Sequence, residues 1–527
     1  MPSTVPTQVP EKAGPRQWAG LAVLALPTLL ISLDQSVLFL ALPHLAESLD
    51  PSANQTLWIM DIYGFMIAGF LVTMGTLGDR IGRRKLLTGG AVVVGVASLL
   101  AAFSTSAEML IVTRALLGIA AATLMPSTLA LIGTLFRDPL QRGRAIAVWA
   151  CCFMGGTALG PVVGGIMLEY FWWGSVFVLG VPVMVLLLVT APFVLPEYRN
   201  PDAGRIDLPS VVLSLGAILP VIYGLKEIAR EGWGLLPPLA IAVGLAIGFL
   251  FVARQHKLSA PLLDLTLFRQ GAFTASLLIL MLAMITMGGS YLFITGYLQM
   301  VEGLSPFEAG LWMVPSALVS VVTAMLAPTL AKRFPIGVII GTGLVVTAVG
   351  YALLVFVDPV AGLPLLLTGF VVAFMGTGPI GALGTNLVVG SAPPEKAGSA
   401  ASMSETSGEF GVSFGLAGLG SLGGAVYQGQ ITVPEGLPEE AAEAVGSSIE
   451  GALAAAETLP PALGEQVLSA AGEAYTAGLN TVAVVCAVLA AVTAGIALTV
   501  LRRAGSAAAH PTPDDGSEAP QPVAQHH

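Results

Sequence analysis

Charged residues are scarce in this sequence of 527 residues. Asp, Glu, Lys and Arg together make up 10% of it, whereas hydrophobic residues make up 55%. Soluble domains carry roughly 25% charged residues. This deficit excludes a chain whose whole surface faces water, and it predicts a protein that resides in a membrane.

Cysteine, histidine and basic residues are also too few or too scattered for the sites they commonly build. Cys151, Cys152 and Cys486 lie inside apolar runs, without metal-ligand or disulfide spacing. The basic residues sit in short loops, which excludes a nucleic-acid-binding surface. None of the five histidines falls in the middle of an apolar run, and no Ser-His-Asp set is visible. We therefore expect no metal, no cofactor and no enzymatic activity.

Long apolar runs dominate the sequence instead. A spanning helix needs roughly 20 mostly apolar residues, and the fourteen runs long enough predict an all-α integral membrane protein. They cover residues 18–40, 57–77, 86–105, 109–134, 144–168, 173–195, 208–227, 236–254, 272–300, 306–330, 336–356, 363–391, 398–426 and 477–502. The first run lacks the short core and cleavage site of a signal peptide, so we interpret it as a spanning helix.

Lys and Arg are distributed unequally between the two sets of loops. Of the 22 such residues, only Lys226 and Arg230 fall on one side, Arg114 falls inside a run, and all others fall on the side of the termini. Cytoplasmic loops carry an excess of Lys and Arg. We therefore expect a cytoplasmic N-terminal tail, 1–17, and a disordered cytoplasmic C-terminal tail, 503–527.

The fourteen helices divide into two halves. A weak similarity between the basic loops after the second and tenth helices predicts a six-helix N-terminal half, 18–195, and a six-helix C-terminal half, 272–502. Two helices, 208–254, are inserted between them. The outer loop 428–474 carries Glu but no Lys or Arg. Its Ala- and Glu-rich part is expected to form one or two short helices, acting either as a solvated spacer or to gather cations.

Four carboxylic acids lie within or near the predicted membrane interior, where a charge is costly. Asp34 lies well inside the first helix and must face a wet cavity, pair with a cation or be protonated. Asp61 lies about one turn into the second, with Trp58 and Tyr63 as interfacial residues or as platforms for a cation. Glu405 and Glu409 are four residues apart, and hence on one helix face. Acids so placed suit a site that exchanges protons for cations, although a structural role stays open for each.

Three further features complete the candidate set. Arg114 is the one basic residue predicted inside the bilayer, where it pairs with an acid or with backbone carbonyls. A compact basic loop, a candidate gate, contains Gly75, Gly78, Asp79, Arg80, Gly82, Arg83 and Arg84. The fifth helix carries small residues at intervals that favour tight packing, with a proline that kinks a helix: Gly156, Gly160, Pro161, Gly164 and Gly165.

In this order, these segments resemble the major facilitator superfamily, in its fourteen-helix drug:proton antiporter branch. Leu33–Pro43, Gly75–Lys85, Arg114, Gly156–Gly165 and Pro261–Arg269 match the branch's motifs. The chain is most similar to QacA-type antiseptic-resistance pumps, on Leu57–Tyr63 and Glu302–Leu311. It departs from them where Ser320 and Ser404 replace acids, which puts divalent-cation transport in doubt.

The resemblance implies a proton-coupled exporter of hydrophobic, monovalent cationic drugs or antiseptics in the plasma membrane of a bacterium. Because one chain already supplies both halves of the bundle, we expect a monomer. It implies that protons and substrate share the four acids, with Arg114, Trp58 and Tyr63 in support. One alternative is a dedicated exporter of a single metabolite, such as a self-made antibiotic. Another, a membrane sensor or enzyme, would need a regulatory domain or catalytic set that this sequence does not show.

Overall fold

A computed structural model of the chain describes residues 13–49, 51, 53–197, 207–231, 234–258, 261–392 and 397–501, and the described part is helical without any strand. Residues 1–12 of the predicted N-terminal tail and the predicted tail 503–527 lie outside these ranges. The elements, in chain order, are α1 Pro15–Leu49, α2 Ala53–Ile81, α3 Arg83–Ala102, α4 Ala107–Leu135, α5 Pro139–Tyr170, α6 Ser175–Val178, α7 Gly180–Val194, α8 Leu208–Glu231, α9 Leu236–Gln255, η1 Leu265–Arg269, α10 Gly271–Gly296, η2 Tyr297–Val301, α11 Pro306–Leu330, α12 Ile336–Leu354, α13 Leu363–Ser391, α14 Ala397–Gln430, α15 Glu439–Ser447, α16 Ile449–Thr458, α17 Pro461–Ile496 and η4 Ala497–Leu501.

The helices confirm the predicted all-α membrane architecture. Within the described residues, 13 segments are long and apolar enough to cross a bilayer. Each coincides with one of the predicted spans. The remaining predicted span, 144–168, lies within α5, whose 32 residues extend about 48 Å at 1.5 Å per residue.

Several helices begin at residues suited to that position. Ser106 accepts a hydrogen bond from the Met109 N–H at the start of α4, and Asp138 accepts one from the Leu140 N–H ahead of α5. Ser305 and Glu308 form a reciprocal capping box at α11. Each satisfies backbone donors that the first helical turn leaves without partners. Pro in the first turn of α5 and α11 adds a fixed φ where its missing N–H costs nothing.

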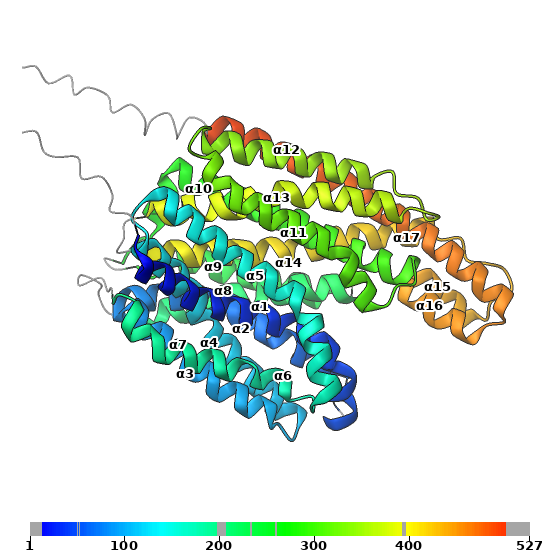
Figure 1. Ribbon diagram of the computed structural model, residues 1–527. Helices are drawn as coiled ribbons and strands as arrows, with labels where there is room; N and C mark the ends of the chain where they lie inside the picture. The colour runs from blue at the N-terminus through cyan, green and yellow to red at the C-terminus, as the bar shows by residue number, and fades with distance from the viewer. Residues whose placement is uncertain are drawn as a thin grey trace, which may run out of the picture.

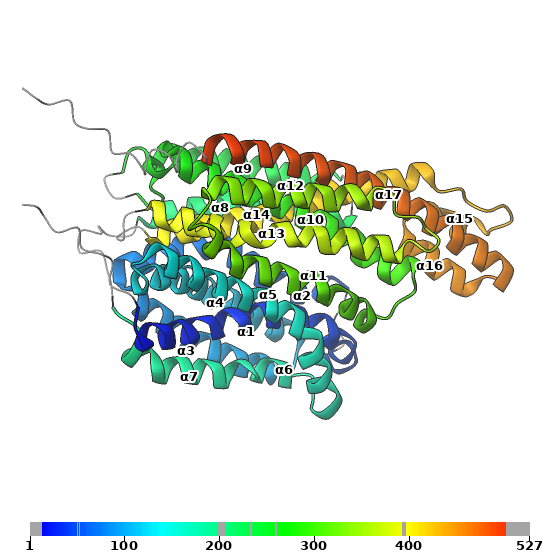
Figure 2. The ribbon, with the colours of Figure 1, turned by 45° about the horizontal axis from the view of Figure 1, so that its top comes forward.

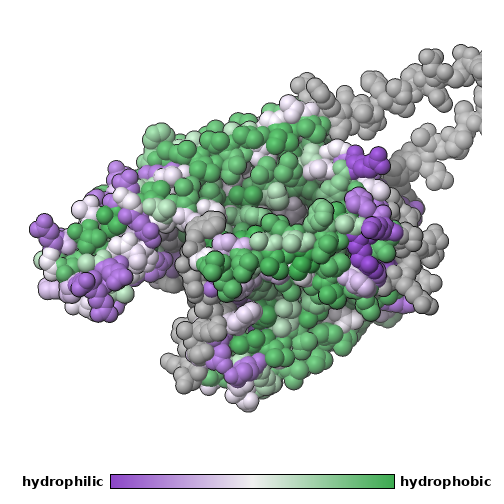
Figure 3. Space-filling view, turned by 180° about the vertical axis from the view of Figure 1, so that it is seen from behind, coloured by the Kyte–Doolittle hydropathy of each residue, from purple (hydrophilic) through white to green (hydrophobic). Residues whose placement is uncertain are grey.

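The outer surface carries a broad apolar band. Large side chains such as Phe193, Phe249 and Phe356 are more than two thirds exposed. Figure 3 shows apolar residues covering the middle of the molecule, with hydrophilic residues gathered towards its two ends. Such a band suits a surface that faces lipid rather than water.

The chain forms two helical halves with an inserted pair between them. Figures 1 and 2 show α1–α7 on one side and α10–α14 with α17 on the other. Each half has its own buried core. The inserted helices α8 and α9 pack on each other, and α8 also contacts both α2 and α14. It therefore lies against one helix of each half.

Both described chain ends lie at one end of the bundle, which we call the terminal end. Pro15 of α1 and Leu501 of η4 lie there, and α15 and α16 project from the opposite, outer end (Figure 1). The expected short helices of the loop 428–474 are these two, and α16 packs on α17. The predicted start of the last helix at 477 is wrong, because the helix begins at Pro461. Ala and Glu favour helix although they are poor membrane residues, so helicity continues beyond the apolar run.

Candidate functional site

Asp34 and Arg114 form an ion pair inside the N-terminal half. Nη1 of Arg114 on α4 lies 2.6 Å from Oδ2 of Asp34 on α1. Arg114 is 1% exposed, and its Nε donates to the Ile59 carbonyl of α2 at 3.3 Å. Arg114 therefore has an acid and a backbone carbonyl as partners, the two alternatives expected from the sequence. Its guanidinium also lies 4.6 Å from the ring centre of Tyr63, so the aromatic face here covers the protein's own cation.

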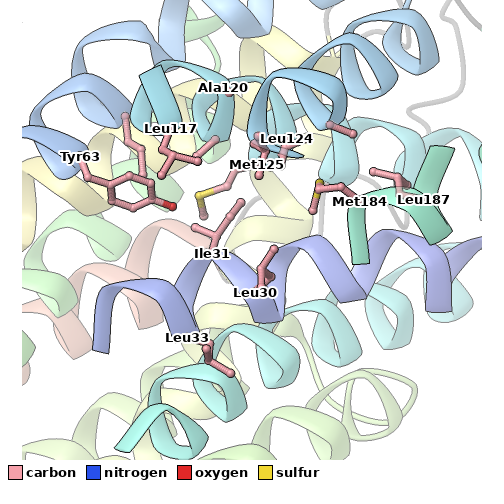
Figure 4. Packing of buried hydrophobic residues seen from close by; sticks show 14 of the residues in the cluster. Leu30, Ile31, Leu33, Tyr63, Leu117, Ala120, Leu124, Met125, Met184 and Leu187 are labelled. Atoms are coloured by element: carbon pink, nitrogen blue, oxygen red, sulfur yellow. The ribbon is translucent and has the colours of Figure 1, made fainter. Parts of the chain in front are cut away.

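A small cavity adjoins this pair, with a volume of about 30 Å³. Asp34, Tyr63 and Ser98 contribute polar groups to walls that are otherwise mainly apolar. Figure 4 shows the side chains of α1, α2 and α4 that pack there, among them Ile31, Tyr63 and Leu117. The volume suffices for a water molecule but is far below the roughly 300 Å³ of a drug-sized pocket. The cavity can therefore hydrate Asp34 but cannot hold a drug-sized substrate.

Asp61 also has a basic partner, one that the sequence analysis did not assign. Oδ1 of Asp61 on α2 lies 2.7 Å from Nζ of Lys226 on the inserted helix α8. The ammonium lies 4.9 Å from the ring centre of Phe65. Trp58 is 39% exposed and contacts Phe65 with its ring, so it lies at the rim of this cluster. Lys226 was counted only as a loop charge, since a pairing between distant helices leaves no local signal.

Glu405 and Glu409 lie on α14, which packs against α2 and α8. Both side chains are partly buried. Within the described part of the chain, neither carboxylate forms a hydrogen bond or an ion pair. Glu409 interacts electrostatically with Tyr63 and with Lys226, and Glu405 with Glu409. The structure thus brings all four predicted acids to the region where α1, α2 and α4 face α14 and α8.

The predicted gate loop joins the two halves at the terminal end. Asp79 forms an ion pair with Arg83, and both side chains are almost fully buried. Nη1 of Arg83 donates to the Gly75 carbonyl at 3.1 Å. The second oxygen of Asp79 accepts from the backbone N–H of Ser399, 3.1 Å away in the first turn of α14. A carboxylate at a helix N-terminus is favoured by the helix dipole, so Asp79 links α2 of one half to α14 of the other.

The remaining gate residues shape this loop. Gly82 has φ +114°, a conformation open to glycine. A Cβ at Gly78 would lie 3.0 Å from Nη1 of Arg83. Arg84 donates to the Leu195 carbonyl at 3.1 Å, and Arg80 to the Pro261 carbonyl at 3.5 Å. The loop is thereby attached to α7 and to the segment that precedes η1.

Further contacts join the two halves at the terminal end. Arg142 on α5 donates to Asn386 on α13 at 2.9 Å, and a Cβ at Gly143 would lie 3.3 Å from Cβ of Pro328 on α11. The sequence analysis missed these contacts because Arg142 was counted only as a topogenic loop charge. With Asp79, they attach three helices of the C-terminal half to the N-terminal half.

The inserted pair is also fixed to this end. The buried Gln255 of α9 accepts a hydrogen bond from the Leu262 N–H at 2.7 Å, and Thr76 of α2 donates to the Leu262 carbonyl at 2.6 Å. Arg254 holds Asp207 through two hydrogen bonds, 2.7 and 2.8 Å long. These bonds hold the pKa of Asp207 well below its usual range. The pair therefore stays ionised at neutral pH.

The glycine motif of α5 packs against α1 at Gly156. A Cβ at Gly156 would lie 2.0 Å from Oγ of Ser32 and 2.3 Å from the Leu29 carbonyl oxygen. Gly160 and Gly164 are buried, whereas a Cβ at Gly165 would meet nothing within 4 Å. The side chain of Pro161 lies outside the described residues. The motif therefore divides into packed and open glycines.

Ser320 and Ser404, which replace acids of the QacA-type pumps, are buried in the C-terminal half. Ser320 on α11 lies 3.3 Å from the Thr377 hydroxyl on α13, and Ser404 is 5% exposed. Among the described residues, no group of three His, Cys, Asp or Glu side chains is placed to hold a metal ion.

Comparison with known sequences shows extensive similarity. The model of the Major Facilitator Superfamily matches residues 24–416. The multidrug efflux pump LfrA of Mycolicibacterium smegmatis is 43% identical, over 95% of this chain and 98% of the relative. The methyl viologen resistance protein SmvA of Salmonella typhimurium is 35% identical, over 87% of this chain and 93% of the relative. A tetracenomycin C resistance and export protein of Streptomyces glaucescens is 29% identical, over 92% and 91%.

Solved structures show the same fold. The human organic anion transporter MFSD10 superposes with a TM-score of 0.54 and 16% identity, over 90% of this chain and 100% of that chain. A bacterial homologue of the human lysosomal transporter Spinster, in an inward-facing and unoccupied conformation, gives 0.54 and 18%, over 93% and 98%. At such identities the likeness concerns the fold alone.

Proposed function

This chain belongs to the major facilitator superfamily and is a multi-pass membrane transporter rather than an enzyme, and on that premise we propose that it is a proton-coupled antiporter. It exports hydrophobic, monovalent cationic drugs or antiseptics across the plasma membrane of a bacterium. The names of its relatives, a multidrug efflux pump and a methyl viologen resistance protein, support drug export. One chain supplies both halves of the bundle, which supports a monomer.

The proposed topology places the terminal end in the cytoplasm. The gate lies between α2 and α3, Arg142 and Arg144 lie near the start of α5, and Lys332 and Arg333 follow the end of α11. This distribution agrees with the positive-inside rule. The halves 18–195 and 272–502 then flank the insert 208–254, and the loop 428–474 lies outside. In the present state the halves are joined at the proposed cytoplasmic end.

Proton coupling is assigned to Asp34, and its ion pair with the buried Arg114 is the observation that carries the proposal. Protonation of Asp34 removes the carboxylate charge and leaves the buried guanidinium without its counterion. A buried charge without its partner is strongly unfavourable. Loading a proton therefore favours another arrangement of α1 against α4, while the adjoining cavity provides room for a water that delivers the proton.

Cation binding is assigned to the acids of α14, with Asp61 in support. Among the described residues, Glu405 and Glu409 lack hydrogen-bonded partners, and Glu409 interacts electrostatically with Tyr63 of α2. Two nearby carboxylates repel each other when both are ionised, so a proton or a cationic substrate relieves that repulsion. Proton and substrate thereby compete for the same groups, which is the requirement for exchange.

Alternating access needs a gate that opens and closes. The Asp79–Ser399 hydrogen bond and the Arg142–Asn386 contact close the cytoplasmic end in this state. They lie on α2 with α14 and on α5 with α13, so a rocking of one half against the other breaks both. We assign Asp79, Arg80, Arg83 and Arg84 to this gate.

Ethidium efflux from energised cells tests the proposal, with the intact chain compared with Asp34→Asn at equal expression. We expect the intact chain to extrude ethidium, an uncoupler to stop it, and the substitution to abolish it. Efflux that continues in uncoupled cells would contradict proton coupling. Efflux that survives Asp34→Asn would move the coupling role to Glu405.

A second candidate, a dedicated exporter of one metabolite, is favoured by one observation. The tetracenomycin C relative is similar over nearly its whole length, and its name describes export of a single antibiotic. This candidate would be favoured if the folded protein does not export ethidium or other lipophilic cations but confers resistance to one antibiotic.

A further inference from the structure

We propose that Lys226 of the inserted helix α8 acts as a tethered cation that occupies one acid of the binding region and thereby sets the charge of substrates that the transporter accepts. The inference rests on the proposed function and adds a specificity-determining residue to it. Lys226 lies outside both six-helix halves, on a helix that contacts α2 and α14.

The surroundings of the Lys226 ammonium are those that a lipophilic cation would require. Its Nζ lies 2.7 Å from Oδ1 of Asp61 and 4.9 Å from the ring centre of Phe65. A carboxylate with an aromatic face is the usual recognition pair for an organic cation. A Cβ at Gly64 would lie 3.9 Å from Nζ, so the α2 backbone lies close to the ammonium.

The pair is accessible rather than sealed in a core. The side chain of Lys226 is 29% exposed and that of Asp61 is 32% exposed. By contrast, the side chain of Arg114 in the other pair is 2% exposed. An accessible ammonium on a flexible four-carbon stem can be displaced at small cost, whereas the guanidinium of Arg114 cannot.

The balance of charge in the region then depends on Lys226. Arg114 neutralises Asp34 and Lys226 neutralises Asp61, which leaves Glu405 and Glu409 as the acids without an ion-pair partner in the described part of the chain. The positive charge of Lys226 also acts on Glu409. An added positive charge on the substrate meets this ammonium at close range, where the repulsion between unit charges is large. Lys226 therefore favours monocations over dications.

A merely structural pair that holds α8 against α2 makes a different prediction. Loss of such a structural pair would lower the stability of the protein and weaken the binding of all substrates alike. A tethered cation changes the ratio between substrates of different charge. The discriminating readout is therefore the ratio of affinities for a dication and a monocation, not the level of activity.

The test measures binding of ethidium, a monocation, and propidium, a dication with the same ring system, to purified full-length protein in nanodiscs. Intact protein is compared with Lys226→Met, which keeps the chain length but removes the charge. We expect the propidium-to-ethidium affinity ratio to rise about tenfold in Lys226→Met. Lys226→Arg should keep the wild-type ratio, and so should Lys332→Met, the same change at an exposed position of the terminal end.

A double-mutant cycle with Asp61→Asn completes the test. With Asp61 neutral, Lys226→Met should still raise the ratio, because the repulsion by the ammonium is removed, but by less than in the intact background, because no carboxylate is freed. An unchanged ratio in Lys226→Met, or an equal loss of both ligands, overturns the proposal. If Lys226→Met does not fold, Lys226→Gln replaces it with the same expectations. Failure of the proposed antiport function would appear in the cell assay instead, as ethidium efflux by the intact chain that continues when an uncoupler is added.

Discussion

At the scale of single residues, the charges inside this bundle are arranged as pairs between helices far apart in the sequence. Asp34 pairs with Arg114 and Asp61 with Lys226. Each acid was identifiable from its cost in a membrane, because that cost is a property of one residue. The partner of each was not, because pairing depends on how the helices pack.

Gly82 provides a residue-scale prediction. Residues other than glycine adopt its φ of +114° only with strain, and a Cβ there would lie 2.4 Å from Oε1 of Glu197. We expect Gly82→Ala to destabilise the protein by about 1–3 kcal/mol, seen as a lower unfolding temperature in detergent. Gly89→Ala is the matched control on α3, since its Cβ would meet nothing within 4 Å. An equal unfolding temperature for the two variants would refute the strain argument.

At the scale of elements, the apolar runs predicted where helices lie better than where they end. Thirteen described helices satisfy the length and hydropathy expected of spans, and each matches a predicted run. The ends differ more: α17 begins at Pro461 and not at residue 477, because Ala-rich sequence remains helical beyond the apolar core. The attachment of Gln255 to Leu262 was not predictable either, because neither residue belongs to a motif with a local physical meaning.

Packing of α5 on α1 gives the prediction at this scale. A methyl group at Gly156 would lie 2.3 Å from the backbone oxygen of Leu29, and rotation of a side chain cannot relieve that clash. We expect Gly156→Ala to push α5 from α1 at a cost of about 1–3 kcal/mol, measured as a fall in unfolding temperature. Gly165→Ala, on the same helix, faces open space and should leave that temperature unchanged. A similar fall in both would show that the helix, not the contact, is sensitive.

At the scale of the whole molecule, two halves joined by contacts at one end suit a transporter that rocks about a central site. The basic residues of the gate were identifiable as a group from their glycine spacing and charge. Their partners in the other half, the Ser399 N–H among them, were not, because a backbone donor at a helix start has no side-chain signal. The gate thus combines one half's sequence motif with the other half's geometry.

If this end must open during transport, a covalent bond across it stops the cycle. A Cβ at Gly143 would lie 3.3 Å from Cβ of Pro328, near the range of about 3.5–4.5 Å that a disulfide requires. We expect Gly143→Cys/Pro328→Cys, with Cys151, Cys152 and Cys486 changed to Ala, to lose ethidium efflux on oxidation and to regain it on reduction. The oxidant should not change ethidium efflux by either single cysteine variant. Efflux that persists in fully cross-linked protein would mean that these helices stay together throughout transport, and that the gate opens elsewhere.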